Sequence, residues 1–489
     1  METANKSIQK YTEIIKPFKK PFATIACIYL IAISAILRAN FNYIDDMERV
    51  ASGQKGWDNF SRYLSNFFST FIHADTYLTD ISPFTQILAV LILAASGVIL
   101  LYVITNNNNF NYWQCIALVP LGLSPYFLEC ISYKYDSVYM ALSIFASIAP
   151  LLLKNKKTIL YCAVSIAGIL VVCTTYQAAS GIFPMLVVFL AVRDWIQHQK
   201  EEKEILKFIF TSIVGYGIGL MIFKTLLMKP IDTYVSNSIP GLNTILSGSL
   251  AHLKQYYIYV VTDFKTEWLV LIFIMCIAYV LVMIKDSLRN KFLTLIVSVL
   301  SLAIMAGMAF GLYPVLESPL YSPRAMYGFG VFIAIISITI SSTNRAYFGK
   351  LVCVILSWAF FVFAFTYGNA LYSQSEYTNY RISMVIDDLN DLEIFNTEEI
   401  KTVQISGSIG YSPVIRNMPQ DYQMLNRLIP ITFREEWLWG AYGFVYYYDI
   451  KNIQTDQHID LITLELPVLK DTMYHTIRGD NTHVLIELK

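Results

Sequence analysis

The sequence predicts an all-α polytopic membrane protein with about eleven transmembrane helices, followed by a C-terminal α+β domain. Three observations support this fold class. The 489 residues are 55% hydrophobic and only 15% charged, whereas soluble proteins carry roughly a quarter charged residues. The apolar residues gather in runs of about 17–22, the length at which a helix crosses ~30 Å of hydrocarbon. Residues 369–489 are too polar to span a membrane and numerous enough to form a small core.

The apolar runs place eleven predicted spans along the chain, by length and hydropathy. A lysine-containing polar segment precedes the first run and a poor cleavage site follows it, so we expect an uncleaved first span. The fifth and sixth runs could instead form one span and a re-entrant segment, because the sixth is short and contains Pro184. The predicted spans are residues 21–38, 83–104, 112–128, 137–153, 158–175, 179–192, 206–225, 267–284, 292–313, 326–342 and 350–368.

Lysine and arginine in the short loops predict the orientation, because cytoplasmic loops are enriched in these residues. The short loops on one side of the membrane are rich in lysine and arginine, whereas the short loops on the other side contain only Lys134 and Arg324. The N-terminus is therefore predicted to be cytoplasmic, and an odd number of spans places the C-terminal domain outside. A net charge of zero argues against nucleic acid as a partner. The basic side comprises the N-terminal segment, the turn 154–157 and the loops 193–207, 285–291 and 345–350.

Three outer segments follow from this topology: loop one (residues 39–82), a middle loop (227–264) and the tail. We expect two domains, a transmembrane domain of residues 1–368 and a tail domain of residues 369–489. The middle loop contains an amphipathic stretch that predicts an interfacial helix (Ile245, Leu250, Leu253, Tyr257 and Val260). The tail pattern predicts a helix at 382–392 and strands at 402–405, 461–466 and 483–488.

Loop one begins with two adjacent acids, Asp45 and Asp46, directly after the first span. Sugar transfer from a phosphate carrier needs a base for the acceptor hydroxyl and positive charge on the leaving phosphate. Adjacent side chains point in different directions, so one acid would serve as the base and the other would orient substrate or bind a cation. The alternative is a polar cap at the end of a helix, where Asp is common.

Loop one contains three further candidates for substrate binding, Arg49, Trp57 and Arg62. Trp57 could stack on a sugar or anchor the loop at the membrane interface. In the second outer loop, Lys134 and Asp136 lie at the membrane edge, where ionisable groups often mark a site. They could equally form a local ion pair that contributes little.

Two polar positions lie later in the outer loops. Tyr176 and Gln177 follow the fifth predicted span and could contact substrate or pack between helices. Arg324 precedes the tenth span, at a helix start that also favours an anion. A guanidinium recognises phosphate with two parallel hydrogen bonds, so Arg324 is the candidate phosphate ligand, with lipid-headgroup contact as the alternative.

Together these motifs resemble the serotype-converting O-antigen glucosyltransferase II family of temperate phages and enteric bacteria. They are Asp-Asp-x-x-Arg after the first span, Gly-x-x-x-Trp-x-x-x-x-Arg behind it, Ser-Tyr-x-Tyr-Asp in the second outer loop, Tyr-Gln at the fifth span and Pro-Arg before the tenth. The likeness runs in order over nearly the whole chain. It implies a GT-C-like fold, with the base at Asp45 or Asp46, a second-loop acid at Asp136 and Arg324 facing the donor phosphate.

The resemblance also implies the reaction and its partners. Glucose would pass from undecaprenyl-phosphate glucose to an O-antigen sugar outside the bacterial inner membrane, with a small flippase and a lipid glucosyl synthase acting upstream. The residues give no clear metal-ligand set beyond the acids, so a divalent cation stays open. A flippase or transporter for a lipid-linked sugar is the first alternative, although the apolar runs contain almost no charge. An O-antigen polymerase or ligase is the second.

Overall fold

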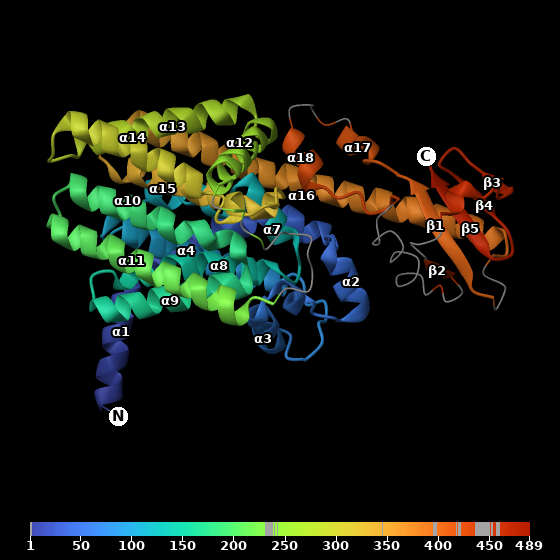
Figure 1. Cartoon of the computed structure of the whole chain (residues 1–489), viewed down its shortest axis with the longest axis horizontal. Helices are drawn as coiled ribbons and strands as arrows, with labels where there is room; N and C mark the ends of the chain where they lie inside the picture. The colour runs from blue at the N-terminus through green and yellow to red at the C-terminus, as the bar shows by residue number, and fades with distance from the viewer. Residues whose placement is uncertain are drawn as a thin grey trace.

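The computed structural model describes residues 2–229, 238, 240–241, 243–344, 346–394, 399–416, 418, 422–435, 450, 453–455 and 460–489, with backbone alone for residues 2–15. Parts of the predicted middle loop and Arg345 lie outside these residues. A bundle of long helices carries a small sheet domain beyond one of its ends (Figure 1). The chain enters the bundle with α1 (Glu2–Ala39) and leaves it with α16 (Tyr347–Asp391).

Eight helices of the described chain are long and apolar enough to cross a membrane, or nine if one bent pair is counted as a span. The apolar segment Gln177–Ile196 is a candidate span distinct from α9 (Thr158–Thr175), so the alternative of one span plus a re-entrant segment is not needed. The eight are Lys16–Ala39, Phe84–Thr105 (α4), α9, Gln177–Ile196 (η3, Gln177–Gly181, with α10, Ile182–Ile196), Glu202–Leu227 (α11, Glu202–Ile222, with η4, Phe223–Leu227), Thr266–Lys285 (α13), Lys291–Met308 (α14) and α16.

The predicted count of eleven is not confirmed, because three predicted spans are short or broken. The fourth corresponds to α8 (Ser137–Ile148) with η2 (Ala149–Leu153), and the tenth to α15 (Gly328–Ser342); both are shorter apolar helices. The third consists of α5 (Tyr112–Ile116), α6 (Val119–Leu123) and α7 (Pro125–Ser132), with a 61° bend before α7.

Proline explains the break in the third predicted span. Pro120 and Pro125 each lie in the first turn of a short helix, where the missing N–H is tolerated but the preceding helix must end. The Tyr29 hydroxyl donates a 2.7 Å hydrogen bond to the carbonyl of Leu118. A free carbonyl inside the bundle therefore has a partner, as an apolar environment requires. Gly122 admits the Tyr29 ring, because a Cβ there would lie 2.8 Å from it.

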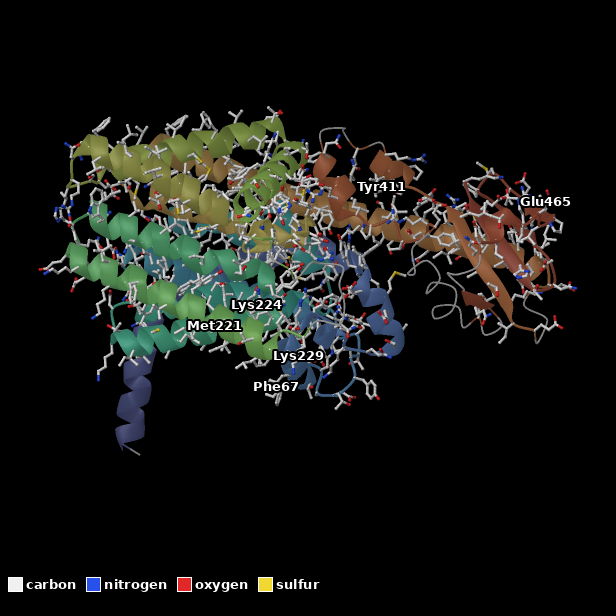
Figure 2. The ribbon with its side chains drawn as sticks, in the orientation of Figure 1. Phe67, Met221, Lys224, Lys229, Tyr411 and Glu465 are labelled. Atoms are coloured by element: carbon white, nitrogen blue, oxygen red, sulfur yellow. The ribbon has the colours of Figure 1, made fainter. Side chains whose placement is uncertain are left out.

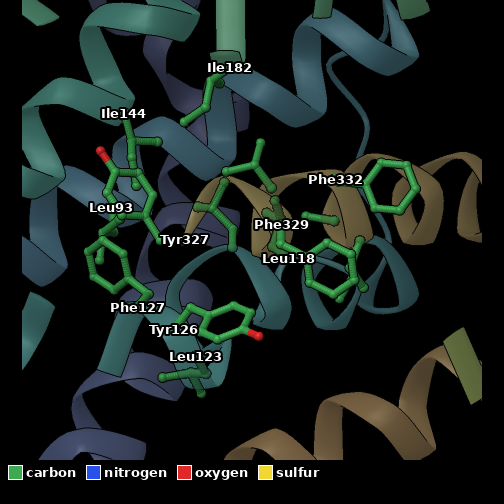
Figure 3. Packing of buried hydrophobic residues seen from close by; sticks show 14 of the residues in the cluster. Leu93, Leu118, Leu123, Tyr126, Phe127, Ile144, Ile182, Tyr327, Phe329 and Phe332 are labelled. Atoms are coloured by element: carbon green, nitrogen blue, oxygen red, sulfur yellow. The ribbon is translucent and has the colours of Figure 1, made fainter. Parts of the chain in front are cut away.

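Aromatic and aliphatic side chains from many helices fill the bundle core. Phe127 and Tyr327 pack edge to face, with ring centroids 5.7 Å apart, and Leu93 and Ile144 lie beside them, while Leu118 lies near Phe329 (Figure 3). The core connects α7 with α15 and thereby fixes the loops that leave these two helices.

The basic loops meet at one end of the bundle. The Leu288 N–H donates to the carbonyl of Ile196 over 3.0 Å, and Lys154 lies 3.4 Å from Asp194. At the opposite end lie α2 (Asp45–Ser52), η1 (Trp57–Phe60), α3 (Tyr63–Ile72), α7, η5 (Tyr313–Val315), η6 (Pro323–Ala325) and α12 (Ile245–Asp263), the helix predicted in the middle loop. Three of the five predicted basic segments, 154–157, 193–207 and 285–291, therefore lie at the same end of the bundle.

The C-terminal region combines the end of α16 with a sheet of order β2-β1-β5-β4-β3. Strand β1 is parallel to β2 and β5, whereas β4 is antiparallel to β3 and β5. Ile382, Val385 and Leu389 of α16 pack against the sheet in a separate core. The strands are β1 (Lys401–Gly407), β2 (Ile453–Thr455), β3 (Val468–Asp471), β4 (His475–Gly479) and β5 (His483–Leu488).

The helix predicted at 382–392 and the strands at 402–405 and 483–488 are confirmed by this arrangement. The strand predicted at 461–466 is wrong. Residues Leu461–Thr463 form a 3-10 turn (η7), because the Asp460 carboxylate accepts the Ile462 N–H over 3.1 Å and caps it. The predicted domain boundary at residue 368 lies inside α16, which continues through it.

Candidate functional site

The acids of loop one begin α2, which follows a sharp turn after α1. Ile44 precedes α2 with φ 48° and ψ −101°, a conformation that is rare for a β-branched residue. Such outliers persist only where the surroundings hold them, and they cluster at functional sites. The turn places the two carboxylates, Asp45 and Asp46, in different environments.

Asp46 is fully buried and connects loop one to the second outer loop. Its Oδ2 atom accepts the Tyr43 N–H over 3.1 Å and the Lys134 N–H over 2.9 Å. Its Oδ1 atom is buried without a hydrogen-bond partner in the described part of the chain. Burial raises the pKa of Asp46 to about 8, although the nearby Arg49 charge opposes the rise.

Asp45 is half-buried, and its carboxylate makes no hydrogen bond or ion pair within the described residues. It lies within electrostatic reach of Tyr133. Burial raises the pKa of Tyr133 well above its ordinary value, and the Asp45 charge adds to this rise. Of the two predicted acids, Asp45 is therefore the one whose carboxylate is partly exposed and makes no hydrogen bond among the described residues.

Arg49, Trp57 and Asp136 form one buried cluster. Arg49 makes an ion pair with Asp136 Oδ2, and the indole N–H of Trp57 donates to Asp136 Oδ1 over 2.5 Å. The Arg49 guanidinium stacks 4.8 Å from the centroid of Trp57. Both Asp136 carboxylate oxygens have a partner in this cluster, so the cluster fixes loop one against α8.

Lys134 is also buried. Its ammonium donates to Asn42 over 2.7 Å and to Asp80 over 3.0 Å, and thereby connects the beginning and the end of loop one. The local Lys134–Asp136 ion pair considered from sequence is absent from the described contacts, because each residue has a partner in loop one.

Arg62, Tyr176 and Gln177 meet beside this region. Arg62 donates to the Gln177 side chain over 3.3 Å and stacks 4.6 Å from the Tyr176 ring centroid. Gln177 in turn donates to the carbonyl of Phe60 over 3.2 Å. Tyr176 packs against Tyr327, with ring centroids 6.1 Å apart, so this group borders the helix that follows Arg324.

Arg324 is held by a buried acid, Glu129 of α7. Its guanidinium Nη1 lies 3.0 Å from Glu129 and donates to the Tyr133 hydroxyl over 2.6 Å. Glu129 also accepts the Arg324 N–H over 2.5 Å and the Ser322 hydroxyl over 3.1 Å. These contacts fix the direction of the guanidinium before any ligand binds.

A cavity of about 260 Å³ opens beside this arginine. It lies where the turn before α2, helix α7 and η6 meet the segment before β2, which contains α17 (Pro413–Arg416) and α18 (Gln423–Leu428). Tyr411 of that segment lies between the bundle and the sheet (Figure 2). The cavity is lined by Tyr43, Ile44, Glu129, Ser322, Arg324, Tyr411, Asn426, Arg427, Ile429, Pro430, Ile431 and Arg434.

The fold brings the predicted residues to one end of the bundle, but only Arg324 lines the cavity. Sequence reasoning missed Glu129, Arg427 and Asp263, whose carboxylate forms an ion pair with Arg427. Glu129 could have been predicted from the sequence, because an acid within an apolar helix is costly unless it is paired. Among the described residues, no group of three or more His, Cys, Asp or Glu could hold a metal ion.

Comparisons with known proteins extend this picture. The sequence model of the family described as glucosyl transferase GtrII matches residues 34–335, more than half of the chain. A protein of Salmonella phage P22, named an uncharacterized 55.3 kDa protein in the gtrB 5' region, is 23% identical over 416 residues. That alignment covers 81% of this chain and 84% of the phage protein. No solved structure matches the chain.

Proposed function

Because the chain belongs to the glucosyl transferase GtrII family, we propose that it moves glucose from undecaprenyl-phosphate glucose to a hydroxyl of an O-antigen sugar. The family assignment confirms the resemblance found in the motifs and supports a glycosyltransferase. The donor, the side of the membrane and the mechanism are our proposals. The reaction would take place at the outer face of the bacterial inner membrane, on the side of the cavity.

One observation carries the proposal: a carboxylate that makes no hydrogen bond in the described chain directly follows a residue that lines a cavity with three arginines. Asp45 directly follows Ile44, which lines the cavity together with Arg324, Arg427 and Arg434. Glycosyl transfer from a lipid phosphate needs a base on one side of the reacting carbon and positive charge on the other. The cavity and its rim provide both kinds of group.

In the proposed reaction, Asp45 accepts the proton of the acceptor hydroxyl as that oxygen forms a bond to C1 of glucose. The bond between C1 and the phosphate oxygen breaks, and its electron pair leaves with undecaprenyl phosphate. Arg324 stabilises the charge that develops on this phosphate. Because Glu129 and Tyr133 already orient the guanidinium, little reorganisation is needed in the transition state.

We assign the other predicted residues to two supporting roles. Asp46, Arg49, Trp57, Lys134 and Asp136 hold loop one in the position that presents Asp45 to the cavity. Arg62 and Gln177, which lie beside the buried Tyr176, form a second polar group that we propose contacts sugar.

The upstream partners follow from the proposed donor. A lipid glucosyl synthase would form undecaprenyl-phosphate glucose, and a small flippase would bring it to the outer face. The flippase alternative for this chain itself has less support. A transporter would need charged groups within its spans, whereas Arg193, Asp194 and Lys350 lie near helix ends.

The first test measures glucosyl transfer in membranes supplied with undecaprenyl-phosphate glucose and O-antigen. We expect Asp45→Asn to lower kcat about 10²–10⁴-fold, the usual contribution of a general base. Asp46→Asn should retain more activity, because the buried Asp46 accepts backbone hydrogen bonds that an Asn oxygen can partly replace.

Glu48→Gln provides the matched control, since Glu48 is a half-buried acid on the same helix. Normal transfer by Asp45→Asn, with wild-type amounts of protein in the membrane, would rule out the proposed base. Absence of transfer by the wild type would reject the reaction itself.

A further inference from the structure

The segment that contains α17 and α18 returns from the sheet domain to the bundle. Its Met424, Leu425 and Leu428 side chains are buried in the bundle core. The carbonyl of Leu428 accepts hydrogen bonds from the hydroxyls of Tyr43, over 2.7 Å, and Tyr367, over 3.3 Å. The segment lies beyond residues 34–335, yet it forms one wall of the cavity beside loop one.

Arg427 of α18 is oriented by groups from the bundle. Its Nη1 atom forms an ion pair with Asp263 at the end of α12, and its Nη2 atom donates to the carbonyl of Tyr321. The guanidinium also lies 4.2 Å from the Tyr259 ring centroid. Asp263 has a second partner, the Tyr126 hydroxyl, at 2.9 Å.

These contacts occupy only part of the hydrogen-bonding capacity of Arg427. A guanidinium carries five N–H groups, and the two contacts to Asp263 and Tyr321 use two of them. The side chain also lines the cavity, on the wall formed by the C-terminal segment. A fixed guanidinium at a cavity wall is suited to bidentate binding of a phosphate.

The charge of the cavity favours an anion. Among the described residues, its lining contains three arginines and one acid, Glu129, while the Asp263 carboxylate pairs with Arg427. The volume of about 260 Å³ lies below the ~300–1,000 Å³ of cavities for drug-sized ligands, so it suits a head group and not a polyprenyl chain.

We propose that Arg427, positioned by Asp263, binds the phosphate of the polyprenyl-phosphate donor together with Arg324. This assignment rests on the proposed function and adds a donor-binding residue from outside the region that the family model covers. It also gives the C-terminal segment a role in catalysis, because departure of the phosphate would then be stabilised from two walls of the cavity.

A binding experiment tests the assignment without relying on transfer. Purified protein in lipid nanodiscs is titrated with undecaprenyl phosphate and, as a probe without the anion, with undecaprenol. We expect Arg427→Ala to weaken binding of undecaprenyl phosphate about tenfold or more, as for loss of a charge-assisted hydrogen bond, and to leave undecaprenol binding unchanged. Equal binding of the phosphate by variant and wild type would overturn the proposal, as would an equal loss for both probes.

Two further variants control for loss of binding caused by misfolding. Arg416→Ala removes an exposed arginine of the same segment that does not line the cavity, and it should bind both probes as the wild type does. Arg427→Lys keeps the charge without the bidentate geometry, and it should bind undecaprenyl phosphate with intermediate affinity. If folded Arg427→Lys bound undecaprenyl phosphate no more tightly than Arg427→Ala, phosphate recognition through charge would be contradicted.

Transfer kinetics then identify the source of the phosphate and test the positioning role. We expect Arg427→Ala and Asp263→Asn to raise the KM for the donor more than they lower kcat, and to leave the KM for the acceptor unchanged. A change confined to the acceptor KM would assign the phosphate to a lipid-linked acceptor and overturn our proposal. If the wild type binds undecaprenyl phosphate through Arg427 but transfers no glucose, the proposed function fails while the anion site stands.

Discussion

Asp45 and Asp46 are neighbours in the chain, but the fold gives their carboxylates different surroundings. Asp46 is enclosed and accepts two backbone N–H groups, whereas Asp45 is half-buried and directly follows Ile44, which lines the cavity. The sequence predicted that the two acids would differ in role, because adjacent side chains point apart. It could not predict which acid would be enclosed, since that depends on Lys134 in another loop.

Burial of Asp46 leads to a prediction about pH. Its pKa is raised from 3.8 to about 8, so between these values the folded protein retains a proton that the unfolded chain has lost. The contribution of Asp46 to the free energy of unfolding therefore decreases as pH rises from about 4 to about 8. Asp46→Asn does not titrate, so its melting temperature relative to the wild type should increase across that range.

Melting curves of purified protein at a series of pH values measure this difference. Asp58→Asn removes one negative charge from an exposed position in the same loop and is the matched control. If the melting temperatures of Asp46→Asn and the wild type differ by the same amount at every pH, Asp46 does not titrate as proposed.

At the scale of elements, loop one is fixed to the bundle by buried charges from several positions. The Arg49–Asp136 ion pair, the Trp57 contact and the Lys134–Asp80 pair all connect it to the segment between α7 and α8. Removing one partner of a buried ion pair leaves an uncompensated charge, which typically costs ~3–5 kcal/mol.

A double-mutant cycle tests this anchoring. Asp136→Asn keeps an oxygen for the Trp57 N–H but leaves Arg49 unpaired, so the free energy of unfolding should fall by about 3–5 kcal/mol. Arg49→Met should have a similar effect. The double variant should lose much less than the sum of the two single losses, because no isolated charge remains. Additive losses would show that the two residues act independently.

Local sequence pattern predicted the elements that depend on local physics. Long apolar runs predicted the eight candidate spans, and periodicity predicted the helix in the middle loop and the strands β1 and β5. Residues 112–128 were predicted as one span because the prolines at 120 and 125 hardly change the mean hydropathy of this run. Each proline nevertheless ends the helix before it. The strand predicted at 461–466 failed because the Asp460 cap favours a turn.

The site was predictable only where its residues carry a local signal. Asp45, Arg324 and the second-loop residues lie at the ends of spans, where charged groups stand out against apolar sequence. Arg427 lies in a polar segment without such contrast, and its partner Asp263 is 164 positions away. Contacts of this kind arise from the path of α16 and the return of the chain to the bundle.

At the scale of the whole molecule, the two ends of the bundle differ in charge and in content. The basic loops meet at one end, while the cavity, loop one and the sheet domain share the other (Figure 1). The cavity is built from positions as distant as Tyr43 and Arg434, so it exists only when the C-terminal region has folded back onto the bundle. The proposed reaction therefore takes place at one end of the bundle. Whether that end faces the periplasm or the cytoplasm decides which pool of donor lipid the protein can use.

Labelling of introduced cysteines in intact cells tests that orientation. Met473→Cys introduces an exposed thiol in the sheet domain, and Asn155→Cys introduces one at the basic end. We expect a membrane-impermeant maleimide that reaches the periplasm to label Met473→Cys before lysis, but Asn155→Cys only after lysis, because basic loops remain in the cytoplasm. The wild type is the control for its seven native thiols. The reverse pattern would place the cavity in the cytoplasm, where a flippase would not be needed to deliver the donor, and would contradict transfer at the outer face.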